Sequence, residues 1–281
     1  MKISNILAMA VIAAAGMTTA ASPAWAQTDE LPFDGPYVGV SIGGALQGSD
    51  TGSSILFDRN LDGRFGDTIT TAAGANAFAP GFCGGAANTN APAGGCRDDK
   101  DGVDFAVRAG YDKQIGNVVI GVLAEFGKAD IRDSVSAFSV TPASYTLTRE
   151  LKHNGRLAAR GGYAFGRTLV YGTGGFSWGR VENSFATTNT VNVFTGNGNS
   201  TATGYNVGGG IQHKLSRAIS VGVEYLYTDL RDDDFRLRVS SGPSTPPTNA
   251  FIQGNAQGTD FARSDNRFRY QALRATLTYG F

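Results

Sequence analysis

The residues of this chain best placed for chemistry are charged side chains that recur at even spacing within otherwise apolar segments. Asp104 and Arg108 stand four positions apart, and so do Lys152, Arg156 and Arg160 in turn. Even spacing puts residues on one face of an extended strand, opposite an apolar face. Buried charges must be paired or hydrated. The inward charges are predicted to form either an ion-paired plug or the lining of a narrow ion path. The predicted network contains Asp104, Arg108, Glu125, Lys152, Arg156, Arg160, Glu224 and Arg274.

A second candidate site resembles the opening of a calcium loop. Residues 58–63 read Asp-Arg-Asn-Leu-Asp-Gly, with oxygen ligands at positions one, three and five and then a glycine. Position twelve is Ile69 instead of a bidentate Glu, so the alternative is a turn without an ion. The acidic residues at 98, 99 and 101 could complete the shell. The predicted calcium ligands are Asp58, Asn60, Asp62, Arg64 and Asp67.

The two cysteines, Cys83 and Cys96, lie in a stretch rich in Gly, Ala, Asn and Pro. In an oxidising compartment they are expected to form a disulfide. Closing a loop of about 14 residues stabilises the fold by roughly 3 kcal/mol. A metal site is the alternative, but the chain has no CxxC motif and no histidine near the pair.

A third candidate is the arginine-rich segment between residues 229 and 269. Its six arginines are interleaved with six aspartates, and Phe235, Leu237 and Val239 alternate with two of the arginines. That alternation suggests a strand that projects beyond the membrane. The guanidinium groups suit phosphates of lipopolysaccharide. Ordinary cross-strand ion pairing is the alternative.

Catalysis is not expected. Only His153 and His213 could act as a base, and they are predicted to lie at opposite ends of the fold, without a serine and carboxylate at suitable spacing. With 24 basic and 24 acidic residues, the chain also lacks the basic patch that nucleic-acid binding needs.

Eight alternating segments must position these residues. They are predicted at about 35–46, 102–114, 118–128, 150–165, 168–181, 203–215, 219–229 and 266–281. In the third, Val118, Ile120 and Val122 share the apolar face, whereas Glu125 points inward. The facing of the fifth is ambiguous, because apolar residues occupy both sets of positions.

The connections between these segments alternate between long and short. The short ones lie near residues 115–117, 166–167 and 216–217, and the four long ones include 47–100 and 131–149. Outer-membrane barrels have short periplasmic turns and long outer loops. The sequence therefore predicts an all-β fold: an eight-stranded antiparallel transmembrane up-and-down barrel. A soluble eight-stranded barrel is the alternative, but it would not need so many apolar residues outside.

The N-terminus predicts export. Lys2 precedes an apolar run that ends near Gly16, and Ala24-Trp25-Ala26 is a cleavage site of the A-x-A type. A membrane anchor is the alternative, but the run is short for a span. The predicted organisation is a cleaved signal peptide at 1–26, a short periplasmic lead at 27–34 and a barrel domain at 35–281.

Several motifs resemble those of the OmpA-like, opacity-type outer-membrane barrel family. They are Gly161-Gly162-Tyr163-Ala164-Phe165-Gly166-Arg167, residues 171–179 (YGTGGFSWG), residues 221–230 (VGVEYLYTDL) and the opening Gly35-Pro36-Tyr37-Val38-Gly39. The resemblance covers about residues 35–281. It implies an outer-membrane location and this fold, without naming a ligand. The closing Leu277, Tyr279 and Phe281 are similar to the signal that the barrel assembly machinery reads.

These observations lead to an expected role that is structural or concerned with envelope integrity or surface interaction, and not catalytic. The alternatives are a narrow porin-like channel, and an adhesin that acts through its outer loops. Expected partners are outer-membrane lipid, lipopolysaccharide, the assembly machinery and a host or cell-surface ligand. Calcium is the one cofactor that the sequence suggests.

Overall fold

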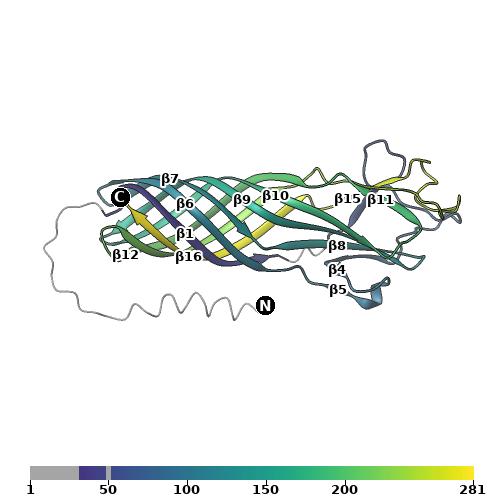
Figure 1. Ribbon diagram of the computed structural model, residues 1–281, viewed down its shortest axis with the longest axis horizontal. Helices are drawn as coiled ribbons and strands as arrows, with labels where there is room; N and C mark the ends of the chain where they lie inside the picture. Colours follow the sequence, from purple (N-terminus) through teal and green to yellow (C-terminus); the bar gives the residue numbers. More distant parts are fainter. Residues whose placement is uncertain (1–31, 49–51) are drawn as a thin grey trace.

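The barrel predicted from the alternating segments is present in the computed structural model, which describes residues 32–48 and 52–281. The strands follow the order β10-β12-β13-β16-β1-β6-β7-β9, and pairing of β9 with β10 closes the cylinder (Figure 1). All neighbouring pairs are antiparallel. The eight strands are β1 (Gly35–Gln47), β6 (Gly102–Ile115), β7 (Val118–Ala129), β9 (Ala143–Phe165), β10 (Thr168–Thr187), β12 (Ser200–Lys214), β13 (Ile219–Arg231) and β16 (Arg267–Gly280).

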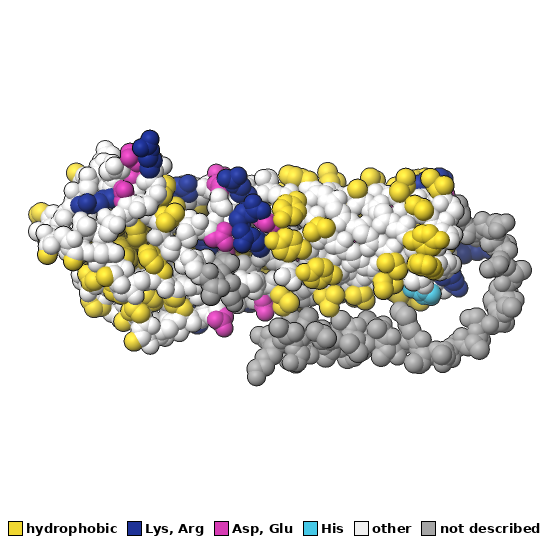
Figure 2. Space-filling model, turned by 180° about the vertical axis from the view of Figure 1, so that it is seen from behind, with side chains coloured by type: hydrophobic (Ala, Val, Ile, Leu, Met, Phe, Trp, Pro, Cys, Tyr) yellow, Lys and Arg dark blue, Asp and Glu magenta, His cyan; other side chains and the backbone are white. Residues whose placement is uncertain are grey.

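Period-two alternation separates an apolar outer face from a polar inner face. On β7, Val118, Ile120 and Val122 are exposed and Glu125 is buried, as predicted. Figure 2 shows the apolar side chains spread over the outside of the barrel. A surface of this kind is stable against lipid, where a closed barrel also satisfies every backbone hydrogen bond. No helix among residues 32–48 and 52–281 is long and apolar enough to cross a membrane.

The short turns are built for tight reversal. Gly116 and Gly166 each begin a two-residue connection and have φ values of 58° and 59°. A positive φ at that position matches the right-handed twist of the flanking strands, and glycine adopts it without a steric penalty. These turns place the ends of β6, β7, β9 and β10 at the periplasmic side.

The long connections, predicted only as long outer loops, contain strands of their own. The predicted loop at 131–149 is a strand pair, made of β8 (Arg132–Ser139) and the first part of β9. A strand β3 (Gly81–Gly84) adds to β8. A separate sheet has the order β11-β14-β15-β2 and contains β11 (Asn192–Gly196), β14 (Leu237–Ser241), β15 (Thr259–Arg263) and β2 (Ile55–Asp58). Figure 1 shows β8, β11 and β15 together beyond one end of the barrel.

We call the described parts of the four long connections, together with the extended ends of β9 and β10, the cap. The cap has its own aromatic core, in which the Phe57 and Phe78 rings stack at 4.5 Å between centroids and Phe261 meets Phe57 edge-on at 4.9 Å. Aromatic pairs in these geometries add to the free energy gained from burying area. The buried core residues are Ile55, Phe57, Ile69, Ala77, Phe78, Val135, Ala137, Ala143, Tyr145, Leu147, Phe235, Leu237, Val239, Phe251 and Phe261.

Contrary to what the sequence suggests, the seventh barrel strand does not continue through residues 235–239. Strand β13 ends at Arg231, and the alternating residues Phe235, Leu237 and Val239 belong to the β13–β14 connection and to β14. Their apolar side chains are buried in the cap core instead of alternating along an extended barrel strand. The cap also contains β4 (Ala86–Ala87), the 3-10 turn η1 (Pro92–Gly94) and β5 (Cys96–Arg97).

Candidate functional site in the lumen and the cap

The inward charges form one buried network in the middle of the barrel. The Arg274 Nε lies 2.8 Å from the Asp104 carboxylate, and the Arg108 Nη2 lies 2.5 Å from Glu125 and 3.1 Å from Glu224. The side chains come from β6, β7, β13 and β16, whose register sets them at one level. Each of these charged residues is at most 6% exposed. These five residues, together with Arg156 and Arg160 described next, make seven of the eight residues predicted for the network.

Neighbouring side chains complete the network. Arg156 bonds to Glu125 and, through Nη2, to Glu224 at 2.9 Å. The Tyr171 hydroxyl donates to Glu224 at 3.0 Å, and Arg160 pairs with Asp112 at 2.9 Å. The predicted network included neither Asp112 nor Tyr171, and Tyr171 was missed because the facing of β10 was ambiguous from the sequence.

Lys152 is the one predicted network member that the lumen does not contain. The pairing of β9 with β10 shifts register between Arg180 and Val181, so that Lys152 has no partner across the ladder. A bulge of this kind reverses the alternation beyond it. Lys152 therefore faces outward, where its ammonium group pairs with Glu150 and Glu182 at 2.7 Å each.

This change removes the excess of positive charge in the lumen. With Lys152 outside and Asp112 inside, four arginines face four carboxylates within the buried network. The arginines are Arg108, Arg156, Arg160 and Arg274, and the carboxylates are Asp104, Asp112, Glu125 and Glu224. A neutral, ion-paired set has no field that would favour ions of one sign.

Apolar layers lie on both sides of the charged layer. Towards the cap, Leu151, Val181, Leu230 and Phe268 pack together with exposed fractions of 0%. Towards the short turns, Phe33 is buried among Val119, Ala164, Leu169 and Tyr171. Phe33 also donates its backbone N–H to the Gln114 side chain at 3.0 Å.

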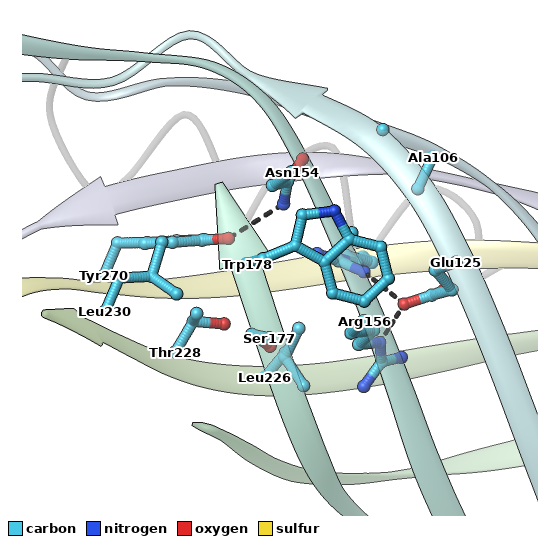
Figure 3. Close-up of a pocket in the computed structure, with 13 residues that line it drawn as sticks. Ala106, Glu125, Asn154, Arg156, Ser177, Trp178, Leu226, Thr228, Leu230 and Tyr270 are labelled. Atoms are coloured by element: carbon cyan, nitrogen blue, oxygen red, sulfur yellow. Dashed lines mark hydrogen bonds and ion pairs between the residues drawn. The ribbon is translucent and has the colours of Figure 1, made fainter. Parts of the chain in front are cut away.

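The remaining space in the lumen is small. The pocket that contains Trp178, Glu125 and Arg156 has a volume of about 10 Å³, and the Asn154 amide donates to the Tyr270 hydroxyl at 2.9 Å across it (Figure 3). That volume is about the space of a single water molecule. Side chains thus fill the barrel, as expected for eight strands.

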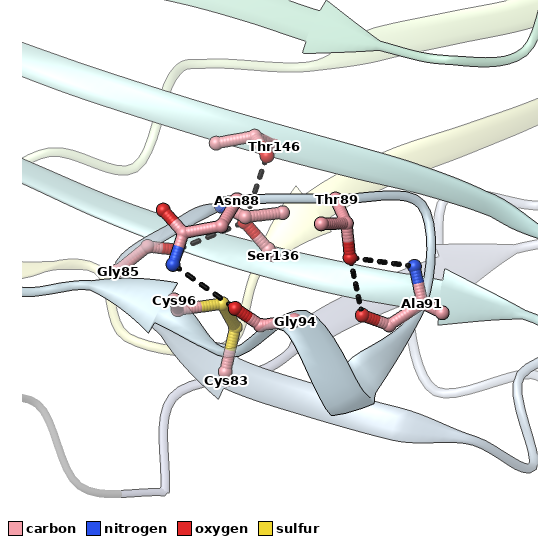
Figure 4. Close-up of a disulfide and its surroundings, with 10 residues drawn as sticks. Cys83, Gly85, Asn88, Thr89, Ala91, Gly94, Cys96, Ser136 and Thr146 are labelled. Carbon is pink, nitrogen blue, oxygen red and sulfur yellow. Dashed lines mark hydrogen bonds between the residues drawn. A yellow bond between two sulfur atoms is a disulfide. The ribbon is translucent and has the colours of Figure 1, made fainter.

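The two cysteines form the predicted disulfide in the cap (Figure 4). It joins β3 to β5 and closes a segment in which the Asn88 amide donates to the Gly94 carbonyl at 3.1 Å. The Ser136 hydroxyl of β8 donates to the Gly85 carbonyl at 2.8 Å. The bridge ties β5 to β3, whereas the pairing of β3 with β8 and this hydrogen bond hold the first long connection against the extended barrel sheet.

The calcium-like turn is closed by its own backbone. Both Asp58 carboxylate oxygens accept backbone N–H groups, from Asp62 at 3.2 Å and from Gly63 at 2.8 Å. The Asp67 carboxylate accepts the Arg59 N–H at 2.8 Å. Within residues 32–48 and 52–281, no group of three or more His, Cys, Asp or Glu is arranged to hold a metal. The acidic residues at 99 and 101 bond elsewhere, to the backbone N–H groups of Ser134 and Gln47. Calcium binding at this turn stays a prediction.

A buried ion cluster connects the cap to the barrel strands. Asp133 of β8 accepts from Arg149 Nε and from Arg263 Nη2, both at 2.6 Å. Arg149 also donates to the Asp265 and Arg267 carbonyls at 3.3 and 2.7 Å. Burial raises the pKa of Asp133, but the Arg263 and Arg149 guanidinium groups outweigh burial and hold this pKa below its ordinary value.

The arginines of the fourth long connection are mostly ion-paired. Arg238 pairs with Asp260, and Arg267 pairs with Asp229 through two bonds of 2.8 and 2.6 Å. Three more of these arginines form ion pairs: Arg231 with Asp233, Arg263 with Asp133, and Arg269 with Asp229 and Asp265. Among the described residues, Arg236 alone of the six forms no ion pair.

The histidines lie far apart. His153 is exposed beside the Phe126 ring near the cap, at 6.0 Å between centroids. His213 shares a hydrogen bond of 2.9 Å with Thr168 near a short turn. The two rings therefore occupy opposite ends of the barrel, and the described contacts give neither one a serine and carboxylate partner.

The chain is similar to known outer-membrane proteins. The 31 kDa outer-membrane immunogenic protein of Brucella melitensis is 28% identical over 74% of this chain and 76% of its own. The 22 kDa outer membrane protein of Rhizobium leguminosarum is 30% identical over 56% of this chain and 66% of its own. The structure of OprG from Pseudomonas aeruginosa aligns with a TM-score of 0.46 and 11% identity, over 88% of this chain and 97% of that one.

The family model described as "Outer membrane protein beta-barrel domain" matches residues 11–281, and the closed barrel described above agrees with it. The predicted signal peptide at 1–26 and most of the lead at 27–34 lie outside the described residues. The chain belongs to the outer membrane protein beta-barrel domain family and is a protein of the outer membrane.

Proposed function

We propose that this protein is a sealed, non-catalytic barrel that anchors a folded cap at the cell surface, where the cap carries a surface-interaction role. The observation that carries this proposal is the combination of a filled lumen with a separate aromatic core in the cap. A chain that needed only a membrane anchor would gain nothing from a 15-residue core outside the membrane. Function in such barrels resides on the outer loops.

The filled lumen supports the proposal against the porin-like alternative. An ion crossing the barrel would have to displace the Arg108, Arg156 and Arg274 side chains from their carboxylate partners. Breaking one buried ion pair costs about 3–5 kcal/mol. The apolar layers above and below would add a dehydration cost for any ion.

The rigidity of the cap supports an interaction role. The disulfide, the buried Asp133 cluster and the aromatic core hold four separate connections in one arrangement. A surface that is organised before binding loses less conformational entropy when a partner docks. The Brucella relative is called immunogenic, which agrees with a part of the molecule that is exposed outside the cell.

Outer-membrane lipid and lipopolysaccharide remain proposed partners. The paired state of Arg267 and Arg269 favours the alternative interpretation of these two side chains as cross-strand ion pairs. Exposed Lys128 and Arg180 on β7 and β10 lie near the outer rim of the barrel. These two are the better candidates for phosphate contacts in lipopolysaccharide.

The proposal is tested by removing part of the cap while keeping the barrel. A variant replaces residues 233–265, including β14 and β15, with a short Gly-Ser turn between β13 and β16. Cells expressing wild type or the variant at equal surface levels are compared for attachment to matrix-coated surfaces. Heat-modifiable gel migration verifies that the barrel has assembled.

The proposal expects attachment with the wild type and its loss with the variant. Equal attachment by both proteins would contradict a role of the cap. If neither protein promotes attachment and the variant makes cells sensitive to detergent, the role is envelope integrity instead of surface interaction.

A further inference from the structure

A pocket of about 210 Å³ lies where the cap meets the barrel. Its walls come from β2, β15 and the two connections that link the cap sheet to the barrel, residues 232–236 and 264–266. Leu56 and Ala262 contribute apolar surface from the two strands, and exposed Ser264 lies at the pocket. The pocket is separate from the lumen network.

Two phenyl rings give the pocket an aromatic side. Phe235 is buried in the cap core, and Phe65 comes from the first long connection. The guanidinium carbon of Arg236 lies 4.7 Å from the centroid of the Phe65 ring. Such stacking fixes the plane of the guanidinium group and leaves its edge available for hydrogen bonds.

Most charges around the pocket already have partners. Asp233 pairs with Arg231 at 2.5 Å and accepts a hydrogen bond from the Asn266 amide. Arg263 pairs with Asp133. Asp233, Asn266 and Arg263 line the pocket, and their bonds within the protein are formed without a ligand.

Two opposite charges in the pocket stay without ionic partners among the described residues. Arg236 donates through Nη1 to the Asp233 and Phe235 carbonyls, both at 2.8 Å, and it meets no carboxylate. The Oδ1 atom of Asp232 is buried and has no hydrogen-bond partner. Asp232 and Arg236 do not form an ion pair with each other. The carboxylate of Asp232 lines the pocket without a balancing cation among the described residues, so a cationic group bound there would compensate its charge.

We propose that this pocket binds a small zwitterion with an apolar side chain, the chemistry of a free hydrophobic α-amino acid. The carboxylate of the ligand would accept hydrogen bonds from Arg236, and its ammonium group would donate to Asp232. The apolar side chain would lie against Phe65, Phe235 and Leu56. Pockets for drug-sized ligands measure about 300–1,000 Å³, so a volume of this size suits a smaller molecule.

The position of the pocket gives such a ligand a second consequence. Asp232 and Arg236 lie in the connection from β13 to β14, and Asn266 lies in the connection from β15 to β16. A ligand that bonds to residues of the β13–β14 connection, just beyond the end of β13, and packs on the cap sheet would fasten that connection to the sheet. Binding would therefore reduce the opening of the cap.

The test uses the full mature chain in detergent micelles, with L-leucine and L-phenylalanine as calorimetric probes. Asp232→Asn and Arg236→Gln each remove one proposed charge. Asp234→Asn and Arg180→Gln are matched controls, because both residues are exposed and neither lines the pocket. N-acetyl-L-leucine lacks the ammonium group, L-leucinamide lacks the carboxylate, and glucuronate is a carboxylate without an amine.

The proposal expects saturable binding of L-leucine that weakens about ten- to hundred-fold in each pocket variant and stays unchanged in the controls. N-acetyl-L-leucine should bind wild type and Asp232→Asn alike, and L-leucinamide should bind wild type and Arg236→Gln alike. Absence of saturable heat from both amino acids overturns the proposal. So does glucuronate binding more tightly than L-leucine, or equal losses in pocket and control variants. Near-UV circular dichroism identifies a misfolded variant. In that case, weaker binding of N-acetyl-L-leucine and L-leucinamide than of L-leucine to the wild type still tests the need for both charges.

Discussion

Replacing Asp133 with Asn should open the cap without unfolding the barrel. The side chains of Asp133 and Arg149 are fully buried. The Asp133 carboxylate accepts two hydrogen bonds of 2.6 Å, from Arg149 and Arg263. The substitution keeps the volume but removes the negative charge that the two guanidinium groups share. Removing one partner of a buried ion pair costs about 3–5 kcal/mol. Two lost charged hydrogen bonds at about 1.5–3 kcal/mol each give about 3–6 kcal/mol, which overlaps this range.

The measurement is the rate at which trypsin cleaves the cap of the protein in detergent. When opening is fast, cleavage follows the equilibrium population of the open form. A loss of about 3–5 kcal/mol corresponds to a rate increase of roughly a hundred- to several thousand-fold. Asp260→Asn is the matched control, since Asp260 pairs with Arg238 at a partly exposed site. Exposed pairs contribute about 0–1 kcal/mol, so the control should change the rate by less than about sixfold. Equal rates for Asp133→Asn and Asp260→Asn would refute the reasoning.

Three further predictions concern acid, assembly and calcium. The pKa of Asp133 is lowered by folding, so its stabilisation is complete above the unfolded value of about 3.9 and is lost as the pH falls through the lower folded value. Cap cleavage by pepsin should therefore accelerate as the pH drops below about 4 in wild type; an acceleration of the same size in Asp133→Asn would argue against this assignment. Deleting Phe281 should reduce the amount of barrel in the outer membrane more than it reduces the urea midpoint of the folded protein, and normal outer-membrane levels would show that the assembly machinery does not need this residue. Calcium should release heat on titration into wild type and less heat into Asp62→Ala, whereas equal heats from both proteins would remove the site.

The barrel could be predicted from the sequence because lipid and lumen impose opposite demands on alternate residues. On β7, Ile120 and Val122 had to face lipid and Glu125 had to face inward, and the exposure of the first two and the burial of Glu125 confirm this. The family resemblance agreed with this alternation. The disulfide between Cys83 and Cys96 could also be predicted from the sequence, since two cysteines in an exported chain are expected to pair in an oxidising compartment.

Local periodicity failed where the chain departs from regular pairing. Lys152 was assigned to the lumen because it keeps even spacing with Arg156, but a bulge opposite Arg180 reverses the alternation between them. Residue types alone do not reveal a bulge. Tyr171 was missed because apolar residues on both faces of β10 hide its direction.

The cap was missed because its core is assembled from residues far apart in the sequence. Phe57, Phe78 and Phe261 meet in space, but each lies in a short strand or a turn without a clear period. A signal was present in the composition, because the long connections hold many Phe residues that neither lipid nor lumen requires. Aromatic residues at this density in outer loops predict a tertiary core.

The central claim is that the barrel is sealed and that the cap carries the activity at the cell surface. Planar-bilayer recording on the purified full-length barrel tests the seal most directly. The bonded network of Arg108, Arg156 and Arg274 with its carboxylates predicts no discrete conductance steps from the wild type. Discrete steps whose size changes with Arg156→Ala or Arg160→Ala would contradict the claim and establish a pore.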